Sequence, residues 1–110
     1  MATTYKVLGQ LASAATTAET LYAVPASTSA VISTITLANI SASAITYRLA
    51  VRPAAASLAN QHYIAYGVTL GANDTTTLTL GLSLATTDVI TVYASAASAL
   101  VANAYGVEIT

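Results

Sequence analysis

The segment TTTLTLGLSL at residues 75–84 decides the fold class. Threonine or leucine stands at each even position, and threonine, glycine or serine stands at each odd position. A period of two places successive side chains on opposite faces of an extended chain, so the segment predicts a β-strand with one apolar face and one polar face. A helix would need a period near 3.6 residues, which this segment lacks.

The same alternation recurs on both sides of this segment. In residues 45–52 the expected inward face consists of Ile45, Tyr47, Leu49 and Val51. In residues 63–70 it consists of Ile64, Tyr66, Val68 and Leu70. Residues 31–38 also alternate, with apolar residues at both odd and even positions. Four further strands are expected at about Tyr5–Gln10, Thr20–Val24, Val89–Ala94 and Leu100–Ile109.

Turn-forming residues separate these segments, among them Pro25, Pro53 and the Asn73-Asp74 pair. About eight strands with turns every ten residues or so predict one antiparallel β-sandwich over residues 1–110, either jelly-roll or immunoglobulin-like. Two alanine-rich stretches have helical propensity. We interpret residues 94–104 as a turn followed by a strand, and expect residues 54–59 to form at most a single helical turn.

The composition is poor in charge and rich in small side chains. The 110 residues include 25 alanines, 18 threonines and 10 serines, and only 6% of residues are charged, against roughly a quarter in average proteins. Alanine buries little area, so a sandwich of this composition is expected to be thin. A net charge of -1 gives the surface little protection against association. Both features favour a protein that is covered by partner subunits, although a free domain solvated by hydroxyl groups is the alternative.

Several classes of function are disfavoured by what the chain lacks. It has no cysteine and one histidine, so it offers no thiolate or multi-histidine metal site, and no cofactor site is expected. Three basic residues are too few for binding nucleic acid through its phosphates. No Gly-x-Ser-x-Gly motif or glycine-rich phosphate loop is present, and no enzyme activity is expected. The long uncharged stretches are interrupted by polar residues, so neither a membrane span nor a secretory signal is expected.

Arg48 and Arg52 form the only cationic patch that the sequence predicts, because they share one strand face. Either they make forked contacts to carboxylates of a partner subunit, or they pair with this chain's own acids, such as Glu19 or Asp88. Both hypotheses remain open at this point.

Three other residues are candidates for a partner interface. His62 precedes Tyr63, and we expect it to bond to a loop backbone at the strand end, with a polar or pH-sensitive interface contact as the alternative. Tyr63 and Tyr93 are expected to point outward, where tyrosine suits protein interfaces, sugar stacking or cross-strand packing. The row Thr75, Thr77 and Thr79 resembles ice-binding surfaces, but it also suits an ordinary solvated strand face.

The order of these segments resembles small β-sandwich virion proteins of tailed bacteriophages. The resemblance extends over nearly the whole chain, through the segments LYAVP (21–25), YRLAVRP (47–53), HYI (62–64), TDVITVYA (87–94) and GVEIT (106–110). It depends on patterns of strand and turn, and this chain departs from them in the high alanine content of its loops.

The resemblance implies a non-enzymatic subunit of a phage particle, assembled in the host cytoplasm. The first expectation is a head decoration or cement protein that stabilises the capsid by bridging capsomers, as a homo-oligomer bound to the major capsid protein or other virion proteins. A tail, baseplate or fibre component is the alternative within that class. A carbohydrate-binding module is the alternative from another class.

Overall fold

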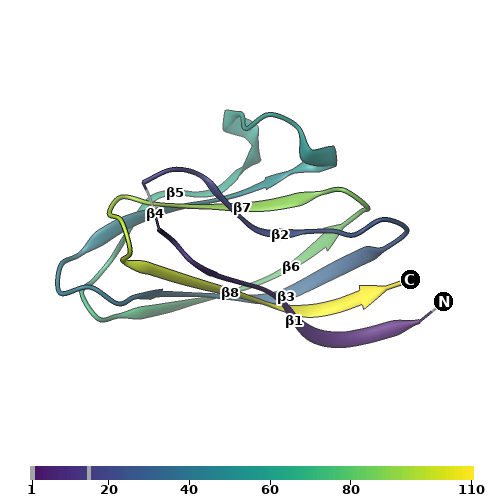
Figure 1. Ribbon diagram of the computed structural model, residues 1–110, viewed down its shortest axis with the longest axis horizontal. Helices are drawn as coiled ribbons and strands as arrows, with labels where there is room; N and C mark the ends of the chain where they lie inside the picture. The colour runs from purple at the N-terminus through teal and green to yellow at the C-terminus, as the bar shows by residue number, and fades with distance from the viewer. Residues whose placement is uncertain (1, 15) are drawn as a thin grey trace.

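The protein is a sandwich of two antiparallel β-sheets (Figure 1). The computed structural model describes residues 2–14 and 16–110. Within those residues the strands are β1 (Thr3–Ala12), β2 (Glu19–Ala23), β3 (Ser29–Asn39), β4 (Ile45–Arg52), β5 (Tyr63–Leu70), β6 (Thr75–Leu84), β7 (Val89–Ala94) and β8 (Leu100–Ile109). Every expected strand segment forms a strand, so the prediction of an all-β sandwich of about eight strands is confirmed.

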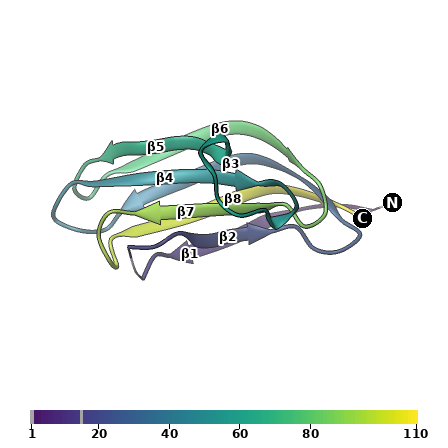
Figure 2. The same cartoon turned by 90° about the horizontal axis from the view of Figure 1, so that it is seen from above.

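The pairing of the strands is that of a jelly roll. Strands β1 and β8, β2 and β7, β3 and β6, and β4 and β5 form nested antiparallel pairs, as if one long hairpin had been rolled up. The β3–β8 and β4–β7 pairings complete the two sheets. Sheet A has the order β1-β8-β3-β6, and sheet B has the order β2-β7-β4-β5, which Figure 2 shows from above. An immunoglobulin-like sandwich would order its strands differently.

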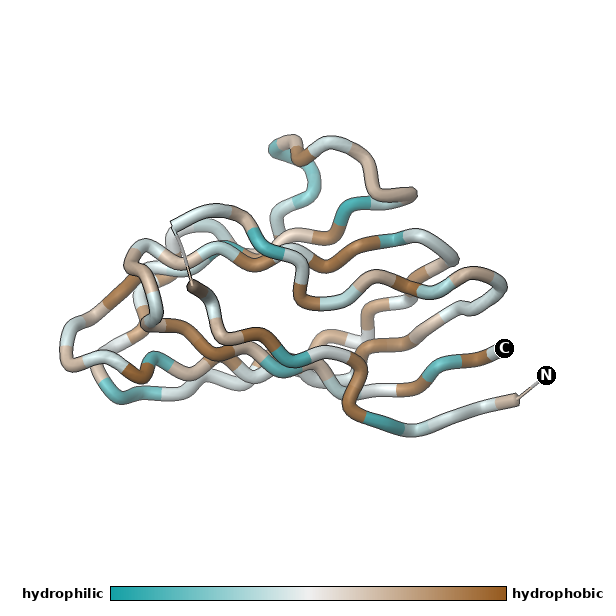
Figure 3. The backbone as a smooth tube through the Cα atoms, viewed as in Figure 1, coloured by the Kyte–Doolittle hydropathy of each residue, from teal (hydrophilic) through white to brown (hydrophobic). Residues whose placement is uncertain are grey.

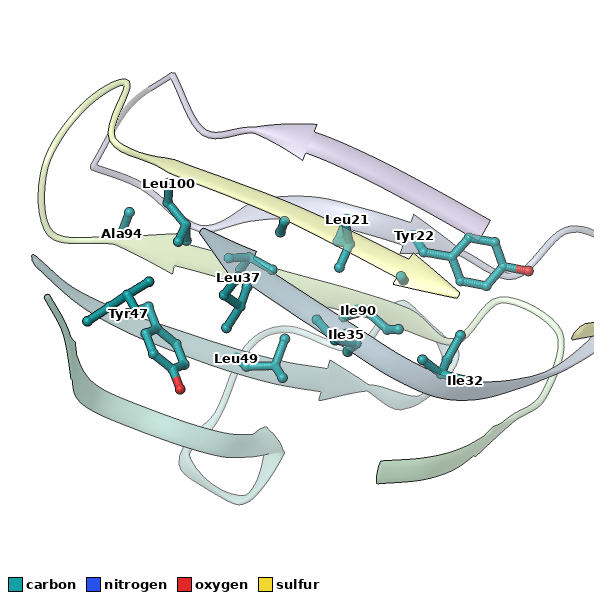
Figure 4. Packing of buried hydrophobic residues seen from close by; sticks show 14 of the residues in the cluster. Leu21, Tyr22, Ile32, Ile35, Leu37, Tyr47, Leu49, Ile90, Ala94 and Leu100 are labelled. Atoms are coloured by element: carbon teal, nitrogen blue, oxygen red, sulfur yellow. The ribbon is translucent and has the colours of Figure 1, made fainter. Parts of the chain in front are cut away.

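The core lies between the sheets, and its large side chains that are fully buried come from the inner strands (Figure 4). The large apolar side chains that are fully buried are Ile32, Ile35, Leu37, Leu49, Ile90, Val92 and Leu100. Strongly hydrophilic positions are few along the whole backbone, and hydrophobic positions occur on strands of both sheets (Figure 3). The alanine-rich stretch at 94–104 forms a turn and strand β8, and Pro53–Ala55 forms a short 3-10 helix.

Strand β8 turns its alanines toward the core. Ala102 lies opposite Leu37 and Leu11, and Ala104 lies opposite Ile35, so bulky neighbours fill the space beside each small residue. Because side chains alternate along a strand, the bulkier apolar residues of β8 that follow the buried Leu100 lie on the outer side of sheet A. These outward residues are Val101, Tyr105, Val107 and Ile109, all half-buried.

A β-bulge in β3 explains why its alternation was ambiguous. Ile32 pairs with Gly106 and Thr34 pairs with Tyr105, which leaves Ser33 as an extra residue. The bulge allows Ile32 and Ile35 to face the core together although their spacing is odd. At this place the backbones approach closely, because a Cβ at position 106 would lie 2.0 Å from the Val31 carbonyl oxygen.

We therefore expect Gly106→Ala to lower the free energy of unfolding by about 1–3 kcal/mol, since the β3 and β8 backbones must separate. Gly71→Ala is the matched control, because its added Cβ would meet nothing closer than 3.8 Å. Urea unfolding followed by circular dichroism measures both variants. Equal stability of the two variants would contradict the close approach.

One ionic network joins the two sheets near the termini. The Glu108 carboxylate on β8 accepts a hydrogen bond from the Tyr22 hydroxyl on β2 at 2.6 Å and pairs with the Lys6 ammonium on β1 at 2.8 Å. The hydrogen bonds from Lys6 and then Tyr22 hold the pKa of Glu108 below its ordinary value, against the effect of burial. Burial and the bond to Glu108 raise the pKa of Tyr22.

This network predicts an acid-dependent contribution to stability. Because the pKa of Glu108 is lower in the folded chain, its contribution is full above the ordinary value of 4.5 and is lost as the pH falls through the lowered folded value. Glu108→Gln is expected to be less stable than the parent at pH 7, and the difference should shrink in acid. Urea midpoints between pH 7 and pH 3 test this, and parallel pH profiles for the two proteins would refute it.

Candidate functional site

The outer side of sheet B holds a cluster of one arginine and three tyrosines. The guanidinium carbon of Arg48 lies 4.3 Å from the ring centroid of Tyr66 and 4.4 Å from that of Tyr93. The Tyr63 and Tyr66 rings meet edge to face, with centroids 4.8 Å apart. We call Arg48, Tyr63, Tyr66 and Tyr93 the Arg48 cluster. The structure thus brings together three of the five residues that the sequence predicts for a partner interface.

The strand register explains the cluster. Arg48 on β4 pairs with Tyr93 on β7 and with Tyr66 on β5, so the three side chains emerge on the same side of the sheet. A guanidinium placed over an aromatic ring is attracted by the negative ring face, and two rings hold its plane between them.

Two hollows border the cluster. One of about 290 Å³ is lined by Thr17, Ala18, Arg48, Ala50, Leu58, Tyr63, Thr91 and Tyr93. The other, of about 330 Å³, is lined by Asn60, Tyr63 and Tyr66. Leu58 supplies part of the wall of the first hollow. It belongs to residues 53–62, the connection between β4 and β5 that rises above sheet B in Figure 1.

Arg52 and His62 hold that connection in place. Arg52 donates from Nε to the Thr91 hydroxyl at 3.0 Å and from Nη1 to the Ala56 carbonyl at 3.0 Å. The His62 Nδ1 accepts a hydrogen bond from the Ala59 backbone N–H at 3.0 Å. The favoured interpretation of His62, a bond to a loop backbone, agrees with this geometry. Arg52 bonds neither to Glu19 nor to Asp88 but to its own loop and strand neighbour.

The acids have local tasks as well. Asp88 accepts backbone N–H bonds from Ala54 and Ala85, and Asp74 accepts one from Thr75. These are the roles expected of aspartate in turns. Among the described residues, no three His, Cys, Asp or Glu side chains gather as a metal site would require. The described residues also form no helix with the length and apolar content that crossing a bilayer requires.

The inward face expected for β5 is wrong for Tyr66, which lies opposite the outward Arg48. Val68 lies opposite the buried Tyr47, and Leu70 lies opposite the buried Ile45. Leu70 is buried, but Ile64, Tyr66 and Val68 are 41%, 60% and 40% exposed. Gly67 has φ +65°, and the register with β4 shifts there, so Tyr66 turns to the outer side beside Arg48. Sequence reasoning therefore missed Tyr66. An isolated glycine within a strand pattern is the signal that indicates such a bulge.

A second exposed surface lies on sheet A. Tyr5 is 82% exposed and Val7 is 47% exposed on the edge strand β1. They lie opposite Val107 and Tyr105, and Val107 lies opposite Val31. These five residues, Tyr5, Val7, Val31, Tyr105 and Val107, form the sheet A patch, which borders a hollow of about 360 Å³. On β6 of the same sheet, Thr75, Thr77 and Thr79 are exposed, with Thr34 and Thr36 beside the latter two.

The contact between Arg48 and Tyr93 predicts an energetic coupling. In a double-mutant cycle of Arg48→Met and Tyr93→Leu, we expect a coupling free energy of about 0.5–1 kcal/mol in urea unfolding. The same cycle with Arg52→Met is the control and should give no coupling, since Arg52 bonds to Thr91 and Ala56. Equal coupling in both cycles would contradict a specific stack.

Comparison with known proteins shows a remote structural likeness. No protein-family model and no curated protein matches the chain. Among solved structures, it is similar to a chain in the acidic stable capsid structure of the Helicobacter pylori bacteriophage KHP30. The two chains are 16% identical with a TM-score of 0.45, and the alignment covers 99% of each. A TM-score of this size supports no argument about function, which must be inferred from this chain's own residues.

Proposed function

We propose that the protein is a non-enzymatic structural subunit of a tailed-phage virion, and that it decorates the head as a cement protein. The jelly roll agrees with this role, since the fold is frequent in viral capsid proteins, but lectins share it. The observation that supports the proposal is that bulky side chains lie exposed on the outer sides of both sheets, Tyr5 and Val7 on sheet A and Tyr66 on sheet B. Exposed apolar patches of this kind mark interaction surfaces.

The sheet A patch is the first of these surfaces. Its side chains are large while the alanines of β8 face the core, which is the reverse of the usual arrangement. The same strand buries its small residues and leaves Tyr105 and Val107 half-exposed. A partner that covered this patch would remove apolar area from water at about 25 cal/mol per Å².

The second surface is on sheet B, where the 60% exposed Tyr66 faces outward opposite Arg48. A protein with contact surfaces on both sheets can bind two neighbours at once, which is what bridging two capsomers requires. Arg48, Tyr63 and Tyr93 lie next to this second surface and are proposed contact residues. Arg52 and His62 support them by holding the connection between β4 and β5.

The proposed mechanism is that binding of this protein is thermodynamically coupled to assembly of the shell. Binding energy that exists only in the assembled shell stabilises that shell against disassembly. The proposed partner is the major capsid protein or another virion protein, with further copies of this chain forming a small oligomer on the lattice. Nucleic acid does not fit as a partner. The cations Lys6, Arg48 and Arg52 are divided between the two sheets, and Lys6 is paired with Glu108.

A carbohydrate-binding module is the second candidate, and the hollow beside Tyr63 and Tyr93 favours it. Sugar hydroxyls need hydrogen-bonding partners, and this hollow offers hydroxyls and Arg48 but no amide or carboxylate side chain. The hollow therefore suits a protein contact better than a neutral glycan.

The test uses heads of the encoding phage that lack this protein. We expect the purified chain to bind them saturably and to raise the temperature at which they break open. Tyr5→Ser should weaken this binding by roughly tenfold, as loss of a central aromatic contact does. Thr77→Ser, on the same sheet outside the patch, is the matched control and should bind like the parent.

Two outcomes would contradict a cement role, and a third would contradict the proposed contact surface. Binding confined to tails would favour the tail alternative. A monomer that binds glycans and no particle would favour the carbohydrate-binding module. Equal binding by Tyr5→Ser and Thr77→Ser would exclude the sheet A patch as the contact.

A further inference from the structure

Two arginines on one strand face have different surroundings. Arg52 donates hydrogen bonds from Nε to the Thr91 hydroxyl and from Nη1 to the Ala56 carbonyl. Arg48 lies between two tyrosine rings, and within the described residues no acceptor hydrogen-bonds to it. Rings stacked on a guanidinium occupy its faces and leave the N–H groups at its edges. Among the described residues, Arg48 therefore keeps its N–H donors without an acceptor while two rings hold its position.

We propose that Arg48 is a receptor for a carboxylate, supplied by an aspartate or glutamate side chain of a different protein. A carboxylate is the anion that matches the planar fork of a guanidinium with two parallel hydrogen bonds. Arg48 is half-buried and borders the hollow of about 290 Å³, so an incoming acid would be partly shielded from water. The exposed ring of Tyr66 lies beside it, as suits a protein partner.

The cluster prepares this arginine for binding. A free arginine side chain loses rotamer entropy when a ligand fixes it, and this loss weakens binding. Tyr66 and Tyr93 have already restricted the guanidinium, so a carboxylate would meet donors that are already ordered. Tyr66 and Tyr93 are positioning residues in this proposal, and Arg48 is the group that touches the ligand.

A second copy of this chain is poorly equipped to supply the acid. Glu108 bonds to Tyr22 and Lys6, and Glu19 accepts from Ser13 and the Ala14 backbone. Both oxygens of Asp88 accept backbone N–H groups, which leaves exposed Asp74, with one bond to Thr75, as the acid least engaged. An acid on another protein is therefore favoured, and a contact from Asp74 of a second copy is an outcome to be tested.

The first experiment needs only the isolated protein. The ¹⁵N-labelled chain is titrated with the capped tripeptide acetyl-Ala-Glu-Ala-amide and with its glutamine analogue, while the Nε–Hε resonances of both arginines are observed. We expect the glutamate peptide to shift the Arg48 resonance and the glutamine peptide to leave it in place. The Arg52 resonance is the internal control, since its Nε already donates to Thr91. Added salt should weaken the effect.

Variants separate the receptor from net charge. Tyr66→Leu should weaken the response of Arg48 by roughly threefold or more, because half of the stack is lost. Lys6→Gln removes one positive charge from sheet A, on the other sheet from Arg48, and should leave the response of Arg48 unchanged. An Arg48 resonance that ignores the glutamate peptide overturns the proposal. A response to glucuronate alone assigns the site to an acidic glycan and also overturns it.

The second experiment rests on the proposed function. Arg48→Gln and Arg48→Lys are both expected to bind particles roughly tenfold or more weakly than the parent, because lysine keeps the charge but lacks the fork. Full binding by Arg48→Lys contradicts a bidentate contact. Self-association that Asp74→Asn abolishes assigns the acid to a second copy and overturns the choice of partner. If the parent binds no particle, the proposed function fails while the peptide result stands.

Discussion

The small inner face of β8 is the constraint on which the rest of the structure depends. This strand lies between β1 and β3, and Ala102, Ala104 and Gly106 let the backbones and the side chains of its neighbours close in. Leu37 and Ile35 fill the room that the alanines leave. Apart from the buried Leu100, the bulky apolar residues of β8 do not face the core. They lie on the outer side of sheet A and make an apolar surface there, next to Tyr5 and Val7.

The other sheet reaches an apolar outer surface by a different route. Gly67 adopts a left-handed conformation that other residues rarely accept, and the resulting bulge turns Tyr66 away from the core. The turned tyrosine meets Arg48, which Tyr93 approaches from the opposite neighbouring strand. The connection between β4 and β5 completes the site because Arg52, His62 and Asp88 anchor it through backbone groups.

The scarcity of charge gives each charged group an identifiable task. Lys6 and Glu108 link strands near the termini, where Ala2 and Thr110 exchange backbone hydrogen bonds. Asp74 and Asp88 support turns, and Arg52 holds a loop. Arg48 differs because its guanidinium is held by aromatic rings alone within the described residues. An oriented charge that has no acceptor among the described residues is the feature on which the proposed partner contact rests.

The sequence by itself determined the strands, because a period of two in side-chain polarity is a local property that any extended chain displays. It also indicated the outward position of Arg48, Tyr63 and Tyr93, since polar or amphipathic residues stand at those positions opposite an apolar face. Only the tertiary structure decided the jelly-roll order, the inward alanines of β8 and the outward turn of Tyr66. Strand order depends on pairings between distant residues such as Thr3 and Ile109. A bulge reverses faces by one residue, and its effect is visible only when the partner strand is in place.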